Sequence, residues 1–449
     1  MVPVPGPTLG WLGILRLGLV QTALGAVVVI STSTLNRVMV VELALPAMVP
    51  GLLVAAHYAV QVLRPRWGYG SDAGGRRTPW IVGGMALLSL GGAGAAAATA
   101  WMSVDPVLGL VAAAVAFLMI GIGVGAAGTS LLVLLATEVA PERRPAAATV
   151  VWLMMIAGFA VTAGTLGAVI DPYSPQRLVA IVAVATAIAF AVATLAVWGV
   201  ERGRRQTPSA EAPPPFRAAL AEAWRDATVR RFSVFVFLSM LAYSAQDLIL
   251  EPYAGLVFGF TPGQSTALSG VHHGGVLLGM IAVGAVCTFL GRRRIGTLGA
   301  WVVGGCLCSG VAMLGLALAG TAPTVWPLRL NVFVLGVSNG AFAVAAIAMM
   351  MSIAAGGQSR REGTRMGVFG AAQAVAFGLG GFLGAVSVDL ARLALDSIPA
   401  AYGTVFAVEA GLFVLSGLLA LRLGRGGEAP ARTIDRLTLG RGVIAGVVR

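Results

Sequence analysis

Long apolar runs recur along almost the whole chain, and they constrain its fold more than any other feature. A helix that crosses the hydrocarbon core of a membrane needs about 20 predominantly apolar residues. Transmembrane β-strands are excluded, because they alternate in polarity and extend over only about 9–11 residues. The sequence therefore predicts an all-α integral membrane protein with twelve transmembrane helices. The runs lie near residues 14–36, 43–63, 79–101, 107–135, 147–170, 178–200, 232–250, 265–290, 296–320, 326–352, 366–388 and 402–423.

The composition agrees with this prediction. Of the 449 residues 58% are hydrophobic and 11% are charged, whereas about a quarter of the residues of a soluble domain are charged. The formal net charge of +12 comes entirely from arginine, since the sequence contains no lysine. The arginines cluster between apolar runs, mostly in even-numbered loops, which predicts that both termini are cytoplasmic. This distribution indicates membrane topology and argues against nucleic acid as a partner.

Two pairs of sequence blocks indicate an internal duplication. WIVGGMALLS at 80–89 aligns with WVVGGCLCSG at 301–310, and both blocks begin the third span of a half. GIGVGAA at 121–127 has a looser counterpart in LGVSNGAFA at 335–343, in the fourth span of each half. Two six-helix halves in parallel duplication are typical of the major facilitator superfamily fold.

The duplication divides the chain into four predicted parts. The linker between the halves is rich in Pro and Arg, and it then places Phe216, Leu220 and Trp224 at helical spacing. This pattern is typical of an amphipathic helix on the cytoplasmic membrane surface. The predicted parts are an N-terminal six-helix half at 1–200, the cytoplasmic linker with its amphipathic helix at 201–231, a C-terminal six-helix half at 232–424 and a cytoplasmic tail at 425–449.

The loop after the second span resembles the loop signature of the major facilitator superfamily, in which a glycine is followed by an aspartate, a second glycine and two basic residues. The glycines allow a tight turn between packed helices. The aspartate is able to bind helix ends or arginines, which predicts a latch on the cytoplasmic side. The alternative is an ordinary charged turn. The residues concerned are Gly68, Asp72, Gly75, Arg76 and Arg77.

The stretch TLNRVMVVELALPAM, residues 34–48, places charged side chains between two apolar runs. We predict that Arg37 lies at the outer end of the first span, where it reaches the membrane surface, and that Glu42 begins the second span. The seventh span ends in a related arrangement, so we predict that Arg37 pairs with Asp247 or Glu251 and closes the outer side between the halves. The alternative is simple anchoring at the interface. The predicted outer cluster is Asn36, Arg37, Glu42, Gln246, Asp247 and Glu251.

Four motifs together resemble the PucC/LhaA family, the bacteriochlorophyll-delivery branch of the major facilitator superfamily. They are TLNRVMVVELALPA, RPRWGYGSDAGGRRTPW, SAQDLILEPYAG and REGTRMGVFGAAQAVAFGLGG. The resemblance implies an assembly factor of photosynthetic purple bacteria, which delivers or holds bacteriochlorophyll while light-harvesting complexes assemble. It implies a multi-pass protein of the bacterial inner membrane, in its intracytoplasmic photosynthetic part. The implied partners are membrane lipids, light-harvesting antenna subunits or the core reaction-centre complex, and bacteriochlorophyll synthase.

A bacteriochlorophyll cargo would need an axial ligand for its magnesium and apolar surface for its ring. Neutral imidazole is the common protein ligand, and the only histidines are His57, His272 and His273, in the second and eighth spans. His57 or His272 is the predicted axial ligand, and no other metal site is expected. Gln373 is a further pigment-binding candidate, on a helix rich in small residues. The alternatives are hydrogen-bonded packing roles for these side chains, with water or a backbone carbonyl as the magnesium ligand.

Two other functions stay open. A proton-coupled small-solute transporter usually keeps a charged side chain near mid-membrane, whereas the acidic residues here gather at span ends, with Glu409 as the exception. A non-transporting scaffold for antenna subunits or bacteriochlorophyll synthase would use the Gly- and Ala-rich helix faces for packing. An enzyme is not expected, because the sequence has no nucleophile–base arrangement or metal-spaced cluster.

Overall fold

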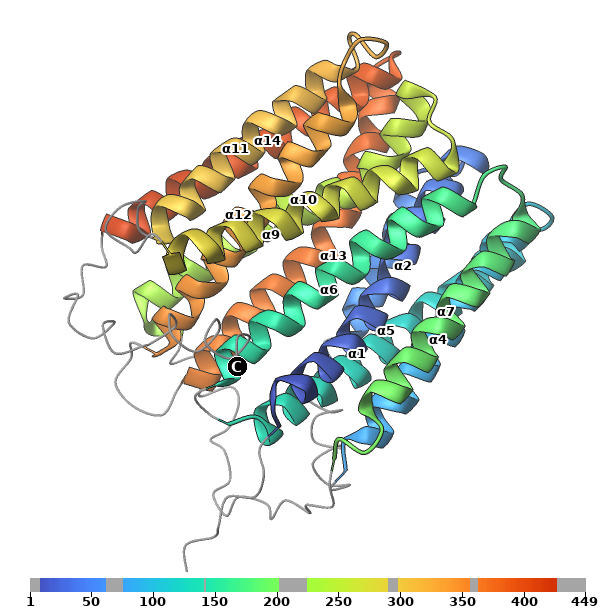
Figure 1. Cartoon of the computed structure of the whole chain (residues 1–449). Helices are drawn as coiled ribbons and strands as arrows, with labels where there is room; N and C mark the ends of the chain where they lie inside the picture. Colours follow the sequence, from blue (N-terminus) through green and yellow to red (C-terminus); the bar gives the residue numbers. More distant parts are fainter. Residues whose placement is uncertain are drawn as a thin grey trace, which may run out of the picture. The chain divides into compact units, whose positions relative to one another are not determined.

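The computed structural model describes residues 9–61, 76–140, 143–201, 224–289, 298–355 and 362–425. Within these ranges the chain is helical, and the predicted all-α fold is confirmed (Figure 1). The α-helices are α1 (Trp11–Val29), α2 (Met48–Val60), α4 (Thr78–Trp101), α5 (Pro106–Glu138), α6 (Arg144–Val169), α7 (Pro175–Val197), α9 (Ala227–Phe258), α10 (Pro262–Phe289), α11 (Leu298–Ala319), α12 (Leu328–Ala355), α13 (Glu362–Ala394) and α14 (Ile398–Arg425). Two π-helical segments are η1 (Ile30–Leu35) and η2 (Val38–Glu42).

Eleven helical segments of the described chain are long and apolar enough to cross a membrane. The first of them runs without interruption from Trp11 to Glu42, because η1 and η2 extend α1 through the polar stretch. The prediction that Glu42 begins the second span is therefore wrong, since Glu42 ends the first helical segment. The described second helix, α2, is shorter than predicted and begins only at Met48.

The contacts within the chain form two compact units, which are described separately. The first unit contains Met1–Leu35 and Ala59–Pro208, and the second contains Asn36–Tyr58 and Ser209–Leu437. Residues 36–58 thus belong to the second unit, although they precede most of the first in sequence. The predicted boundaries at residues 200, 231 and 424 stay predictions, and most of the predicted linker helix lies outside the described residues.

In the first unit, α4 packs along α5 and against α7, while α1 packs against α6 and α7. Glycine allows the close approach of α4 and α5. A Cβ on Gly84 would lie 2.7 Å from the backbone nitrogen of Ala127, and a Cβ on Gly123 would lie 2.6 Å from that of Leu88. No side chain larger than hydrogen fits at either position without a shift of the helices.

In the second unit, α9 packs against α13 and α14, α10 against α12, and α11 against α12 and α14. Gly305 of α11 occupies the same place in its sequence block as Gly84 of α4. A Cβ on Gly305 would lie 2.8 Å from the backbone nitrogen of Phe342 in α12. The duplicated block therefore performs the same packing task in both units, which supports the internal duplication.

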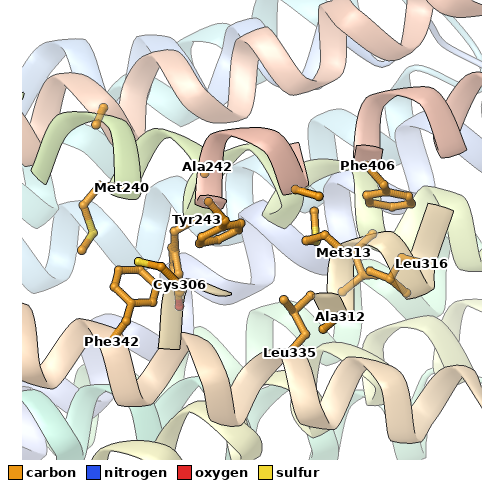
Figure 2. Close-up of a cluster of buried hydrophobic side chains, with 14 of the residues drawn as sticks. Met240, Ala242, Tyr243, Cys306, Ala312, Met313, Leu316, Leu335, Phe342 and Phe406 are labelled. Atoms are coloured by element: carbon orange, nitrogen blue, oxygen red, sulfur yellow. The ribbon is translucent and has the colours of Figure 1, made fainter. Parts of the chain in front are cut away.

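A large apolar core holds the second unit together. Its fully buried aromatic residues come from α9, α12, α13 and α14, and include Phe235, Tyr253, Phe342, Phe369 and Phe406. Figure 2 shows part of this core, in which Tyr243 lies near Phe342 and Cys306. This rigid frame fixes the polar and aromatic side chains of the candidate site.

Candidate functional site

Arg37 is buried in the second unit, with 2% of its surface exposed. Its Nε donates to Ser265 Oγ at 3.2 Å and its Nη2 donates to the carbonyl oxygen of Phe260 at 2.8 Å. Its Nη1 forms an ion pair with the Glu42 carboxylate. The ion-pair partner of Arg37 is therefore Glu42, in place of the predicted Asp247 or Glu251, whereas its position at the membrane surface stays a prediction. The reason is local, because residues five apart in a π-helical turn lie on the same face of the helix. The η2 segment therefore places Glu42 beside Arg37.

Residues 36–48, the connecting segment, are held to the second unit at both ends. At one end, Asn36 Nδ2 donates to the carbonyl oxygen of Leu248 in α9 at 2.7 Å. At the other end, the Asp389 carboxylate of α13 accepts from the backbone nitrogens of Ala47 at 3.0 Å and Met48 at 2.7 Å. Asp389 thus caps the N-terminus of α2, where a negative charge is favourable. Sequence reasoning missed this role of Asp389.

The other three members of the predicted outer cluster lie in α9 and do not bind Arg37. Glu251 is buried and Asp247 is half-buried. Gln246 is fully buried, and it contacts His272 instead. The structure therefore separates the Arg37–Glu42 pair from Gln246, which belongs to a polar network around His272.

The network around His272 joins four helices of the second unit. Ser309 Oγ donates to Asn339 Oδ1 at 2.8 Å, so the Nδ2 of Asn339 faces His272 Nε2, at 3.3 Å. Gln246 Nε2 lies at the same distance from this nitrogen, 3.3 Å. With two amide donors directed at it, His272 Nε2 is the acceptor, and the ring proton is on Nδ1. All four side chains are buried.

Sequence reasoning missed Ser309 and Asn339. One signal was present, because Ser309 stands in its duplicated block where Leu88 stands in the first-half block. A polar residue that replaces an apolar one at an equivalent buried position indicates a specific interaction.

His273 has a fixed tautomer of its own. Its Nδ1 lies 2.9 Å from the carbonyl oxygen of Ser269, one helical turn earlier in α10. A carbonyl oxygen only accepts, so Nδ1 carries the proton and Nε2 carries the lone pair. A hydrogen bond from the second ring nitrogen to a backbone carbonyl is the usual support of a metal-ligating histidine.

A row of rings connects all three histidines within the second unit. The ring centroids are separated by 4.7 Å from His57 to Tyr58, 6.0 Å from Tyr58 to Phe377, 5.9 Å from Phe377 to Tyr243, 6.4 Å from Tyr243 to His272 and 5.2 Å from His272 to His273. We call these six residues the aromatic row. They come from α2, α9, α10 and α13, which lie far apart in sequence.

Gln373 lies beside this row. It precedes Phe377 by one turn of α13, and its Nε2 is 4.0 Å from the sulfur of Met240, which precedes Tyr243 by one turn of α9. The four predicted pigment-binding side chains therefore converge on one region of the second unit. Aromatic rings and imidazoles are side chains that commonly contact large, flat and mostly apolar ligands.

Of the predicted cytoplasmic latch, only Arg76 and Arg77 lie within the described residues. The backbone nitrogen of Arg77 donates to the Glu201 carboxylate at 2.7 Å, and that of Thr78 donates to it at 2.9 Å. Glu201 therefore caps the N-terminus of α4, a role that sequence reasoning did not identify. Among the described residues, no group of three or more His, Cys, Asp or Glu side chains is placed to hold a metal ion.

The fold defines a class of membrane protein. The described helices match the D-xylose–proton symporter with a TM-score of 0.68 and 13% identity, over 91% of this chain and 97% of the symporter. They match a bacterial homolog of the human lysosomal transporter Spinster, inward-facing and occupied, with a TM-score of 0.66 and 13% identity, over 92% and 96% of the two chains. This is a multi-pass membrane protein with the major facilitator fold, as predicted.

The sequence comparison specifies the family within this class. Residues 34–427 match the family described as PUCC protein. The bacteriochlorophyll synthase 44.5 kDa chain of Rhodobacter capsulatus is 52% identical over 413 residues, which cover 92% of this chain and 95% of that one. Protein PucC of Cereibacter sphaeroides is 31% identical over 93% of both chains. The chain belongs to the PUCC family, and the resemblance found in its motifs is confirmed.

Proposed function

We propose that this protein binds bacteriochlorophyll and supports the assembly of light-harvesting complexes in the photosynthetic membrane of a bacterium. The observation that carries the proposal is the aromatic row, which brings His57, His272 and His273 together with flat apolar rings. The name of the Rhodobacter capsulatus relative, a bacteriochlorophyll synthase chain, favours a pigment as the cargo.

The three histidines would not all have the same task. His273 and His57 are our candidates for the axial magnesium ligand, His273 because its proton is held on Nδ1 by the Ser269 carbonyl. His272 is the weaker candidate of the three, because its Nε2 faces the amide nitrogens of Gln246 and Asn339. We assign His272 a structural role instead, in which it holds α10 to Gln246 of α9 and Asn339 of α12.

We propose binding and delivery, with no catalytic step. The word synthase in the relative's name fits a protein that acts beside pigment synthesis, so bacteriochlorophyll synthase is a proposed partner. The other proposed partners are light-harvesting antenna subunits or the core reaction-centre complex, with membrane lipids around the helices.

The test uses tagged protein from phototrophically grown cells, purified in a mild detergent. We expect near-stoichiometric bacteriochlorophyll in the near-infrared spectrum, and a loss of most of it in His57→Phe or His273→Phe. The control is Phe406→Leu, which changes an aromatic residue of the same unit outside the aromatic row. Antenna subunits without pigment would instead support the scaffold. Wild-type protein with neither pigment nor subunits would refute the proposal.

One observation favours the second candidate, a proton-coupled small-solute transporter. Glu409 is buried in α14, and neither of its carboxylate oxygens has a hydrogen-bond partner among the described residues. A buried acidic residue in a membrane span is a typical proton site. Purified protein in liposomes should then move protons with its solute, and Glu409→Gln should abolish the coupling. No proton movement with wild-type protein would exclude this candidate.

A further inference from the structure

Tyr243 lies at the centre of the aromatic row. Its ring centroid is 5.9 Å from that of Phe377 in α13, 6.4 Å from that of His272 in α10 and 6.3 Å from that of Phe342 in α12. Only 9% of its surface is exposed. Three helices therefore fix the orientation of this ring, and with it the position of its hydroxyl group.

No hydrogen bond joins the Tyr243 hydroxyl to another described residue, although the residue is buried and a tyrosine inside a protein usually finds a partner for its hydroxyl. Tyr253, ten residues later in α9, shows the ordinary case, because its hydroxyl donates to the carbonyl oxygen of Leu316 at 2.9 Å. The Tyr402 hydroxyl also lacks a described partner, but its ring packs on Tyr253 and Phe406, outside the aromatic row.

The neighbouring polar groups do not take up this donor. The amide oxygen of Gln246 has no hydrogen-bond partner in the described chain, and Asn339 Oδ1 already accepts from Ser309. The Asp247 carboxylate interacts electrostatically with Tyr243, but no hydrogen bond joins the two described side chains. Tyr243 therefore presents an O–H donor within a row of rings and imidazoles. A ligand that complements it carries a hydrogen-bond acceptor at the edge of a flat, apolar ring system.

We propose that Tyr243 donates a hydrogen bond to a conjugated carbonyl oxygen at the edge of a bound magnesium tetrapyrrole. The inference rests on the proposed function and deepens it, because it identifies the group of the pigment that the protein recognises. An imidazole bound to the central magnesium would fix how far the pigment ring lies from the histidine. A hydrogen bond at the edge of the pigment ring would fix its rotation about the bond between magnesium and imidazole. The protein would then present the pigment in one orientation.

The test compares pigment-loaded wild-type protein with Tyr243→Phe, by resonance Raman spectroscopy of the carbonyl stretches and by near-infrared absorption. We expect the wild type to show a carbonyl stretch at the lowered frequency of a hydrogen-bonded group. In Tyr243→Phe this band should move to the frequency of a non-bonded carbonyl, with a blue-shifted absorption maximum. The dissociation constant of the pigment should rise by about threefold to tenfold.

Tyr402→Phe is the matched control, because it removes another hydroxyl without a described partner from the same unit. We expect its carbonyl bands to equal those of the wild type. Tyr243→His, which keeps a ring and an N–H donor, should keep a lowered carbonyl frequency and serves if Tyr243→Phe does not fold. Bound pigment with identical carbonyl bands in wild type and Tyr243→Phe would overturn this inference alone. A wild type without pigment would overturn the proposed function, and the inference with it.

Discussion

Replacing Arg37 with methionine should lower the free energy of unfolding by about 3–4 kcal/mol. Methionine keeps much of the side-chain length but removes the two hydrogen bonds to Ser265 Oγ and the Phe260 carbonyl, as well as the ion pair with Glu42. A hydrogen bond from a charged group contributes about 1.5–3 kcal/mol, so two bonds at the lower limit give about 3 kcal/mol. The Glu42 side chain is 32% exposed, so solvent screens the ion pair and limits its share to about 1 kcal/mol.

The assay is unfolding in mixed micelles by titration with a denaturing detergent. The matched control is Arg177→Met, because Arg177 is exposed and its Nε donates to one backbone carbonyl, that of Val169, at 2.9 Å. We expect the control to lose less than about 1 kcal/mol. In a double-mutant cycle, Arg37→Met and Glu42→Gln should show a coupling energy of about 1 kcal/mol.

A second readout locates the effect. Backbone amides of the connecting segment, residues 36–48, should exchange hydrogen faster in Arg37→Met than in the wild type, before global unfolding. If Arg37→Met costs no more than Arg177→Met and leaves this exchange unchanged, then the hydrogen bonds of Arg37 do not hold the connecting segment in place.

Three further predictions concern capping, burial and packing. Asp389→Ala removes the cap of α2 and should lower the free energy of unfolding by about 0.5–2 kcal/mol, whereas Asp389→Asn should lose less. Glu409→Met removes a buried carboxylate without described partners and should raise the free energy of unfolding by about 1–3 kcal/mol. A lowered free energy of unfolding would show that the carboxylate is bound in the folded protein. Gly305→Val pushes α11 away from α12 and should lower the free energy of unfolding by about 1–3 kcal/mol. Gly304→Ala, whose Cβ would have no neighbour within 4 Å, should leave it nearly unchanged.

The sequence by itself determined the helical membrane fold, the duplication and the family. These properties are readable because they are local. A transmembrane helix satisfies its own backbone hydrogen bonds, so a continuous apolar run is enough to specify it. The two duplicated blocks, which contain Gly84 and Gly305, likewise revealed the duplication by local sequence similarity alone. The motifs that resembled PucC/LhaA proteins gave the family for the same reason.

Only the tertiary structure decided which side chains meet. Asp389 caps a helix that begins 341 residues earlier, and Asn339 faces a histidine 67 residues earlier. Such pairs depend on how each helix is rotated and shifted against its neighbours, and a hydrophobic pattern leaves both quantities open. Arg37 shows how sensitive they are, since one π-helical turn was enough to give it Glu42 as its partner in place of the predicted Asp247 or Glu251.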